Sequence, residues 1–214
     1  MNLDKIINQS LSYTEYRNFV NQLITEGKTT GNTQSEKLLE FTKLNAQRMN
    51  RLDKTIQLDE NVIKQLQSSH SKYWQWLLIG DAWCGDCAQI IPILNKIVLS
   101  SNDKIKLNII SRDSYPELIE NYSTNGSKSI PKLLVINDNT KEVVHTWGPR
   151  PKPAQAIMLN WKANNNTISW ENFEKELHLW YAKDKGANTI DELVKLMEIC
   201  GNKISIQQLK LLKV

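Results

Sequence analysis

The chain lacks the features of membrane-spanning proteins and of secreted proteins held together by disulfides. None of its apolar runs approaches the roughly 18 residues that span a bilayer, and its first residues, MNLDKIINQSLSYTEYR, contain no apolar segment typical of a secretory signal. Its cysteines, Cys84, Cys87 and Cys200, are too few for a disulfide scaffold. We therefore expect a cytoplasmic protein that makes no contact with a membrane.

The sequence also lacks a block of charge and an internal repeat. Its net charge is +4 over 214 residues, and the small basic excess is spread evenly along the chain. Nucleic-acid-binding domains gather lysine and arginine into one patch, so we expect no nucleic-acid partner. Hydrophobic residues make up 40% and charged residues 23%, which is typical of a globular chain able to bury one core.

Hydrophobic spacing divides the chain into three parts, which we expect to form one compact α/β unit. Residues 1–70 have helical periodicity, with capping-box patterns that begin at Ser12 and Thr33. Residues 71–165 alternate short apolar strands with helices, and residues 166–214 are helical again. The predicted strands are 74–80, 105–110, 132–136 and 143–147, and the helices predicted between or just after them are 88–98, 116–122 and 153–161.

A Cys-x-x-Cys pair, Cys84 and Cys87, stands between the first predicted strand and the helix that follows it. The first N–H groups of a helix are unpaired and carry a partial positive charge, which stabilises a thiolate placed there. Two intervening residues let the second sulfur reach the first after one helical turn. We expect Cys84 to be an exposed attacking thiolate and Cys87 the shielded thiol that resolves the mixed disulfide in thiol–disulfide exchange.

A zinc half-site and a pair of unreactive core thiols are the alternatives for this motif. Zinc requires four ligands, and the remaining candidates, Cys200, His70, His145 and His178, form no second close pair in the sequence. We interpret each histidine as structural, and Cys200 as a small buried residue on the apolar face of a C-terminal helix. No metal site is therefore expected.

The segment Trp83-Cys84-Gly85-Asp86-Cys87 resembles the WCxxC signature of the thioredoxin family. Pro92 matches the proline inside the family's active-site helix, and Gly148 matches a glycine that lines its substrate groove. The run Ser129-Ile130-Pro131-Lys132-Leu133-Leu134-Val135 resembles the family's segment with a cis proline facing the cysteines. These matches extend over roughly residues 72–165.

The resemblance implies a thioredoxin-like core, with a four-stranded mixed sheet flanked by helices and a helical extension at each end. The dithiol would itself be the redox centre, so no bound cofactor is required. The implied partners are a disulfide-containing substrate and a reductant, and we expect a monomer or weak dimer. A cis Pro131 would leave the backbone of Ile130 free to pair with substrate, and we expect Trp83 to form an apolar lip beside it.

The sequence departs from the family pattern at two positions near the cysteines. Leu78 stands where thioredoxins carry a buried acid, and neither Asp81 nor Asp86 obviously replaces it. Asp86 stands in place of the usual proline, and its charge is expected to raise the pKa of Cys84. We expect Arg150 either to remain a solvated loop residue or to act at the site, attracting acidic substrates or supporting the thiolate.

Arg48 lies inside the apolar stripe of the predicted helix that follows Thr33. A polar residue there must reach solvent or find a partner. Arg48 either extends to the edge of the stripe or pairs with the core, for which Asp81 is the first candidate and backbone carbonyls the alternative. The second arrangement makes the N-terminal extension part of the active-site surroundings.

We therefore predict a thiol–disulfide oxidoreductase that reduces protein or small-molecule disulfides. The alternative is a module with the same fold that binds a partner or senses redox state without turnover. The state of the nucleophile separates the two, because an exposed Cys84 with a lowered pKa favours the enzyme and a buried Cys84 with a high pKa favours the module.

Overall fold

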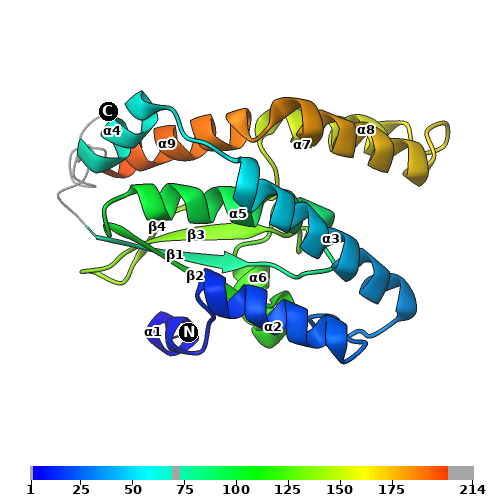
Figure 1. The fold of residues 1–214 in the computed structure, drawn as a ribbon, viewed down its shortest axis with the longest axis horizontal. Coiled ribbons are helices and arrows are strands. Elements are labelled where there is room, and N and C mark those ends of the chain that lie inside the picture. The colour runs from blue at the N-terminus through cyan, green and yellow to red at the C-terminus, as the bar shows by residue number, and fades with distance from the viewer. Residues whose placement is uncertain (1, 69–72, 202–214) are drawn as a thin grey trace.

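The computed structural model describes residues 2–68 and 73–201, which form a four-stranded sheet with the order β2-β1-β3-β4 (Figure 1). β1 (Trp74–Ile79) runs parallel to β2 (Ile105–Ile110) and antiparallel to β3 (Lys132–Asn137). β4 (Val143–Trp147) pairs antiparallel with β3 at one edge. The predicted α/β class with a mixed sheet is confirmed.

The two central strands are buried along almost their whole length because helices cover both faces of the sheet. All residues of β3 are buried, and in β1 only Gln75 is partly exposed. Continuous apolar runs are typical of strands in this position. In the edge strand β4, Trp147 is buried, Thr146 is exposed and the other residues are partly buried, so the sheet's apolar core lies under β1 and β3.

Helix α5 (Gly85–Ser100) lies along one face of the sheet and places the cysteine pair at its first turn (Figure 1). It begins three residues before the predicted start, with Cys84 as its N-cap, and it contains Pro92. After β2, the chain passes through a short 3-10 turn (Arg112–Ser114) and α6 (Pro116–Asn121) before reaching β3. No helix in the described ranges is long and apolar enough to cross a membrane.

The helices before the sheet are α1 (Leu3–Asn8), α2 (Tyr13–Thr25), α3 (Glu36–Thr55) and α4 (Glu60–Ser68). The predicted capping box at Ser12 is confirmed by its reciprocal bonds with Glu15. The pattern at Thr33 was misleading, because α3 is capped by the hydroxyl of Ser35. α1 was not predicted from the sequence.

The N-terminal helices are part of the main core. Their buried side chains belong to the same apolar cluster as the buried side chains of the strands, and include Ile6, Tyr16, Val20 and Met49. Leu11 also exchanges two backbone hydrogen bonds with Ile109, of 2.9 and 2.7 Å, at the outer edge of β2. The extension is therefore integral to the fold.

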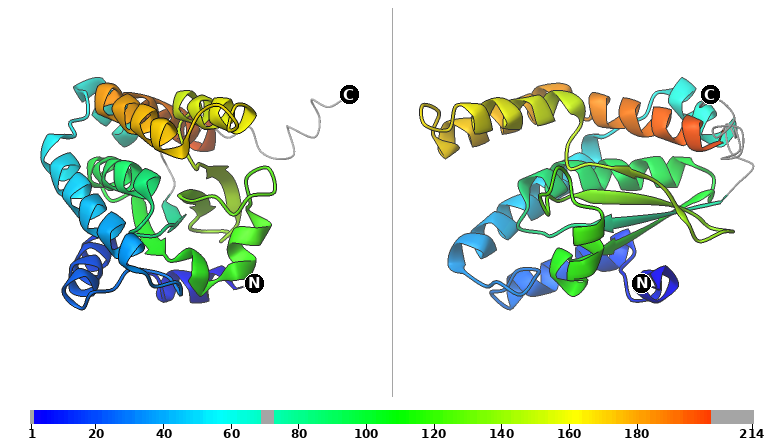
Figure 2. Two further views of the ribbon diagram at one scale, coloured as in Figure 1. Left: turned by 90° about the vertical axis from the view of Figure 1, so that its right-hand side faces the viewer. Right: turned by 180° about the vertical axis from the view of Figure 1, so that it is seen from behind.

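The C-terminal helices divide into two groups (Figure 2). α9 (Ala187–Gly201) joins the main core through side chains that include Leu193 and Met197. α7 (Lys152–Ala163) and α8 (Trp170–Asp184) pack on each other in a separate apolar cluster. That cluster consists of Ala154, Met158, Phe173, Leu177 and Tyr181. The proposed boundary between 165 and 166 thus falls in the loop joining two helices that share one small core.

Candidate functional site

The cysteine pair lies at the junction of β1 and α5. Cys84 is the N-cap of α5, its N–H donates to the carbonyl of Asp81 at 3.1 Å, and both cysteines are free thiols. The prediction that Cys84 is exposed is wrong, because the residue is only 9% exposed. Side chains from outside the β1–α5 turn cover it, and its sulfur is reached through the pocket described below.

Cys87 lies one turn inside α5 and is completely buried. Its sulfur lies 2.9 Å from the position that a Cβ at Gly80 would occupy, so only a glycine fits there without a shift. Burial, followed by a hydrogen bond with Cys84, raises the pKa of the Cys87 thiol well above its ordinary value. Cys84 is the more accessible cysteine of the two, with 9% of the residue exposed against 0% for Cys87.

The loop before β3 faces the first cysteine. The Ile130–Pro131 peptide bond is cis, and the carbonyl oxygen of Ile130 accepts a hydrogen bond from the Cys84 thiol at 3.5 Å. Gly148 packs against this loop with φ of +107°, and a Cβ there would lie 2.4 Å from the carbonyl oxygen of Pro131. Gly148 is therefore required for the close approach of the two segments.

Asp86 does not face the thiols as a free charge. It is buried and forms a two-pronged ion pair with Arg150, with atom separations of 2.9 Å (Nε to Oδ1) and 2.5 Å (Nη2 to Oδ2). The hydroxyl of Tyr181 also donates to Oδ1 at 2.8 Å. Burial raises the pKa of Asp86, and the charge of Arg150 opposes this shift. Arg150 is thus neither a solvated loop residue nor a free cation.

Asp81 and Arg48 do not pair with each other, so Asp81, the first candidate for a partner of Arg48 in the core, is wrong. Asp81 is buried, and its carboxylate accepts hydrogen bonds from the hydroxyl of Ser111 at 2.7 Å and from a backbone N–H at 3.4 Å. Burial raises its pKa, and the hydrogen bond from Ser111 opposes that shift. Arg48 instead donates to the side-chain oxygen of Asn45 at 2.9 Å. The amide of Asn45 in turn donates to the carbonyl of Ala82 at 2.8 Å.

The extension also contributes a buried phenol to the underside of the pair. Tyr16 is 3% exposed, and among the described residues its hydroxyl has no hydrogen-bond partner. Burial raises its pKa well above the ordinary value, and the nearby Cys87 and Asp81 act in the same direction. The chain therefore groups a thiol, a carboxyl and a phenol in an interior position behind Cys84.

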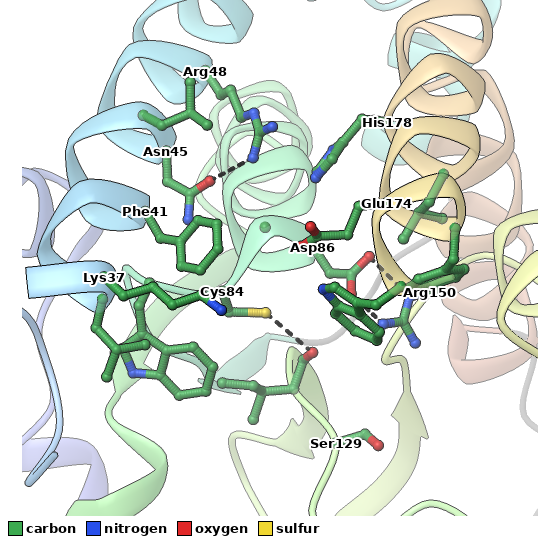
Figure 3. A pocket seen from close by; sticks show the side chains of 18 of the residues that line it. Lys37, Phe41, Asn45, Arg48, Cys84, Asp86, Ser129, Arg150, Glu174 and His178 are labelled. Carbon is green, nitrogen blue, oxygen red and sulfur yellow. Dashed lines mark hydrogen bonds and ion pairs between the residues drawn. The ribbon is translucent and has the colours of Figure 1, made fainter. Parts of the chain in front are cut away.

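A pocket of about 770 Å³ opens above Cys84, between α3 on one side and α8 on the other (Figure 3). The turn from Trp83 to Asp86 and the loop from 127 to 130 complete it. Trp83 is half-buried there, and the guanidinium of Arg112 lies 5.0 Å from the centre of its ring. The side chains that α3 and α8 contribute are Lys37, Leu38, Phe41, Leu44, Asn45, Arg48, Trp170, Phe173, Glu174, Leu177 and His178.

His178 lines this pocket, although its isolation from the other histidines in the sequence favoured a purely structural role. Its ring is 3.0 Å from where a Cβ at Gly85 would stand, and its Nδ1 has no partner among the described residues. Burial and then the charge of Arg48 lower its pKa to about 4. Glu174, His178 and Tyr181 share one face of α8 at helical spacing, and this polar row beside apolar positions was the available signal.

Cys200 and His145, the other metal candidates that the structure describes, do not line this pocket. Cys200 is buried, and burial raises its pKa to about 11, which agrees with its interpretation as a packed apolar residue. His70 lies outside the described residues. Within residues 2–68 and 73–201, His, Cys, Asp and Glu form no group of three or more able to hold a metal ion.

The mixed sheet, with a Cys-x-x-Cys pair opening a helix opposite a cis proline, defines a thioredoxin-like protein. A thioredoxin family model matches residues 31–168, and the chain belongs to that family. The match begins in the loop before α3, so it includes part of the N-terminal extension.

Individual relatives match a shorter segment. Thioredoxin of Bacillus subtilis is 39% identical over 79 residues, which are 36% of this chain and 71% of the relative. Thioredoxin M5 of Oryza sativa chloroplasts is 28% identical over 111 residues, which are 47% of this chain and 62% of the relative. A Pseudomonas aeruginosa protein of unknown function has a similar structure, with a TM-score of 0.55 and 17% identity over 88% of this chain and 98% of that one. This last likeness concerns the fold alone.

Proposed function

We propose that the chain is a thiol–disulfide oxidoreductase that reduces disulfides with Cys84 and Cys87 and needs no bound cofactor. One observation carries the proposal: the sulfur of Cys84 lies at the floor of a pocket and against the Ile130 carbonyl, while Cys87 is buried one turn behind it. An accessible nucleophile backed by a shielded thiol is the arrangement that two-step disulfide exchange requires.

In the first step, the thiolate of Cys84 attacks one sulfur of the substrate disulfide. The substrate S–S bond breaks, a mixed disulfide with Cys84 forms, and the first substrate thiolate leaves and takes up a proton. Cys87 then loses its proton and attacks the sulfur of Cys84, which releases the second substrate thiol and leaves a Cys84–Cys87 disulfide. The dithiol gives two electrons to the substrate, and an external dithiol reductant must restore it.

The second step requires a proton acceptor for the buried Cys87 thiol. Asp81 is buried, has a raised pKa, and its charge acts on Cys87. Leu78 holds the position of the family's buried acid and cannot accept a proton. We therefore assign this role to Asp81. The small number of cysteines also fits a reducing compartment such as the cytoplasm.

The low exposure of Cys84 favours a second candidate, a module that binds a partner or senses redox state without turnover. Single-turnover thiol release separates the two. Reduced protein in a Cys200→Ser background is mixed with bis(2-hydroxyethyl) disulfide, and the released thiol is counted while adducts are followed by mass spectrometry.

The dithiol should release both thiols of each disulfide molecule. Cys87→Ser should release one thiol and keep the other as an adduct on Cys84, and Cys84→Ser should release none. Equal adduct formation by both single variants would contradict the assigned roles. Absence of any release by the unmodified pair would favour the binding module.

A further inference from the structure

Cys84 is reached through a pocket bounded by α3 and α8, and these helices limit the size and shape of a substrate that can reach its sulfur. The two helical extensions rise on either side of the active-site turn, and the nucleophile is only 9% exposed between them. The volume of about 770 Å³ lies within the range of about 300–1,000 Å³ that is usual for small-molecule sites. A compact disulfide fits this entrance better than one held flat on the surface of a folded protein.

The charged side chains of the pocket leave an uncompensated positive charge. Several of its cations are already paired: Arg150 with Asp86, Lys128 with Glu120 and Arg112 with Asp113. Lys37 and Arg48 on α3 have no carboxylate within 4 Å among the described residues, and the other charged side chain in the lining is Glu174 on α8. The unpaired cations therefore lie on the α3 wall.

Arg48 is held at a fixed place in this wall. Its guanidinium donates to Asn45, which is anchored to the carbonyl of Ala82, two residues before the nucleophile. Its Nη1 lies 3.6 Å from the position of a Cβ at Gly85, the residue that follows the nucleophile. Burial lowers the pKa of Arg48. The charges of Glu174 and Asp86 act in the opposite direction, but neither carboxylate lies within 4 Å of the guanidinium.

Most of the guanidinium's N–H donors have no partner among the described residues. Arginine has five donors in a planar fork that matches a carboxylate, and within the described part of the chain Arg48 donates one hydrogen bond, to Asn45. Figure 3 shows Arg48 and His178 on opposite walls above Cys84. His178 stays neutral at ordinary pH because its pKa is lowered to about 4, so it adds a polar contact without a competing charge.

We propose that this pocket selects compact disulfides that carry a carboxylate, and that Arg48 is the residue that binds that carboxylate. The aromatic and aliphatic side chains of the walls, which include Phe41, Trp83 and Phe173, would contact the apolar part of the substrate. This inference rests on the proposed function, and the reaction is the one written above: one disulfide and the dithiol give two substrate thiols and the Cys84–Cys87 disulfide.

The test uses single-turnover reduction of three symmetrical disulfides of similar size and different charge. They are 3,3′-dithiodipropionate, bis(2-hydroxyethyl) disulfide and cystamine, which are anionic, neutral and cationic. Each rate is divided by the rate of the same disulfide with free dithiothreitol, which removes differences in intrinsic reactivity. We expect the normalised rate to be highest for the anion and lowest for the cation, and the preference to decrease with added salt.

Variants then locate the preference. Arg48→Ala should slow reduction of the anion by about tenfold or more relative to reduction of the neutral disulfide by the same variant, as expected for loss of a hydrogen-bonded charge contact. Arg48→Lys should retain part of the preference. Arg51→Ala is the matched control, because it removes the same charge from an exposed position of α3 outside the pocket, and its charge preference should not change.

Each other outcome has a definite meaning. If the unmodified protein reduces all three disulfides with equal normalised rates, or reduces insulin faster than the anion, the proposed preference for compact anionic disulfides is wrong. The proposed oxidoreductase function is then still supported. If Arg48→Ala slows all three disulfides equally, Arg48 is not the carboxylate-binding residue. If none of the three is reduced, the proposed function itself fails and the inference fails with it.

Discussion

The two helical extensions are attached to the sheet in different ways. The N-terminal helices place Ile6, Val20 and Met49 directly in the main core, so their packing and that of the sheet form one apolar body. The α7–α8 pair has its own small cluster, which includes Met158 and Phe173. The two walls of the pocket therefore differ, since one is continuous with the core and the other is a separately packed unit.

A polar contact ties the separate unit to the active-site helix. Tyr181 on α8 and Arg150 just before α7 both bind the carboxylate of Asp86, the residue before Cys87. Such a contact is directional and depends on all its members, whereas apolar packing is spread over many side chains. We therefore expect changes in the N-terminal wall to alter global stability, and changes in the Asp86 contact to alter the position of the α8 wall.

The largest effect is expected from Asp86→Asn. The substitution leaves the buried guanidinium of Arg150 without its counter-charge, and removing one partner of a buried pair costs about 3–5 kcal/mol. Hydrogen exchange should accelerate along α8 while β1 and β3 keep their protection. The double variant with Arg150→Met should recover part of the loss, and uniform acceleration across the sheet would contradict a separately packed unit.

Methionine truncations compare the two walls directly. Met49 is 1% exposed in the main core, so Met49→Ala should lower the free energy of global unfolding by about 2–5 kcal/mol. Met158 is 8% exposed in the small α7–α8 cluster, so Met158→Ala should cost less and act mainly on those two helices. Denaturant melts followed by fluorescence and by circular dichroism provide the measurement, and equal global losses would remove the distinction.

The smallest effect is expected from the titration of His178. Its pKa is about 4 in the folded protein and near 6.5 when unperturbed, so the unfolded chain binds the extra proton first. The stability that depends on neutral His178 is complete above about pH 6.5 and is lost as the pH falls toward 4. The difference in unfolding free energy between the parent and His178→Asn should shrink over this window, and a constant difference would place His178 in solvent.

Local signals located the secondary structure well. The bounds of β2 and β4 match the predicted strands, and the cap at Ser12 follows from a side chain that reaches a backbone N–H group within the same turn. α1 was missed because a helix of six residues gives almost no periodicity. The start of α3 was misplaced because Thr33 and Ser35 both offer a hydroxyl near the helix, and only Ser35 caps it.

The partners of the charged residues were harder to predict. Asp86 was expected to act on the thiols, yet Arg150 and Tyr181 bind its carboxylate from positions 64 and 95 residues away along the chain. Asp81 was the first candidate for Arg48 if that arginine paired with the core, and instead Arg48 binds its own helix neighbour Asn45. Hydrogen bonds of this kind depend on distances that no local pattern contains.

The α/β class and the Cys-x-x-Cys pair at the start of a helix follow from the sequence alone, because strand periodicity and motif spacing are properties of neighbouring residues, and the resemblance to the thioredoxin family rests on that same motif. The tertiary structure decided how the pair is surrounded. It brought α3 and α8 to opposite sides of Cys84, buried Tyr16 behind the pair, and left Arg48 without a carboxylate partner within 4 Å in the described part of the chain. These features arise from packing between segments distant in the sequence, and a pocket exists only once its walls have come together.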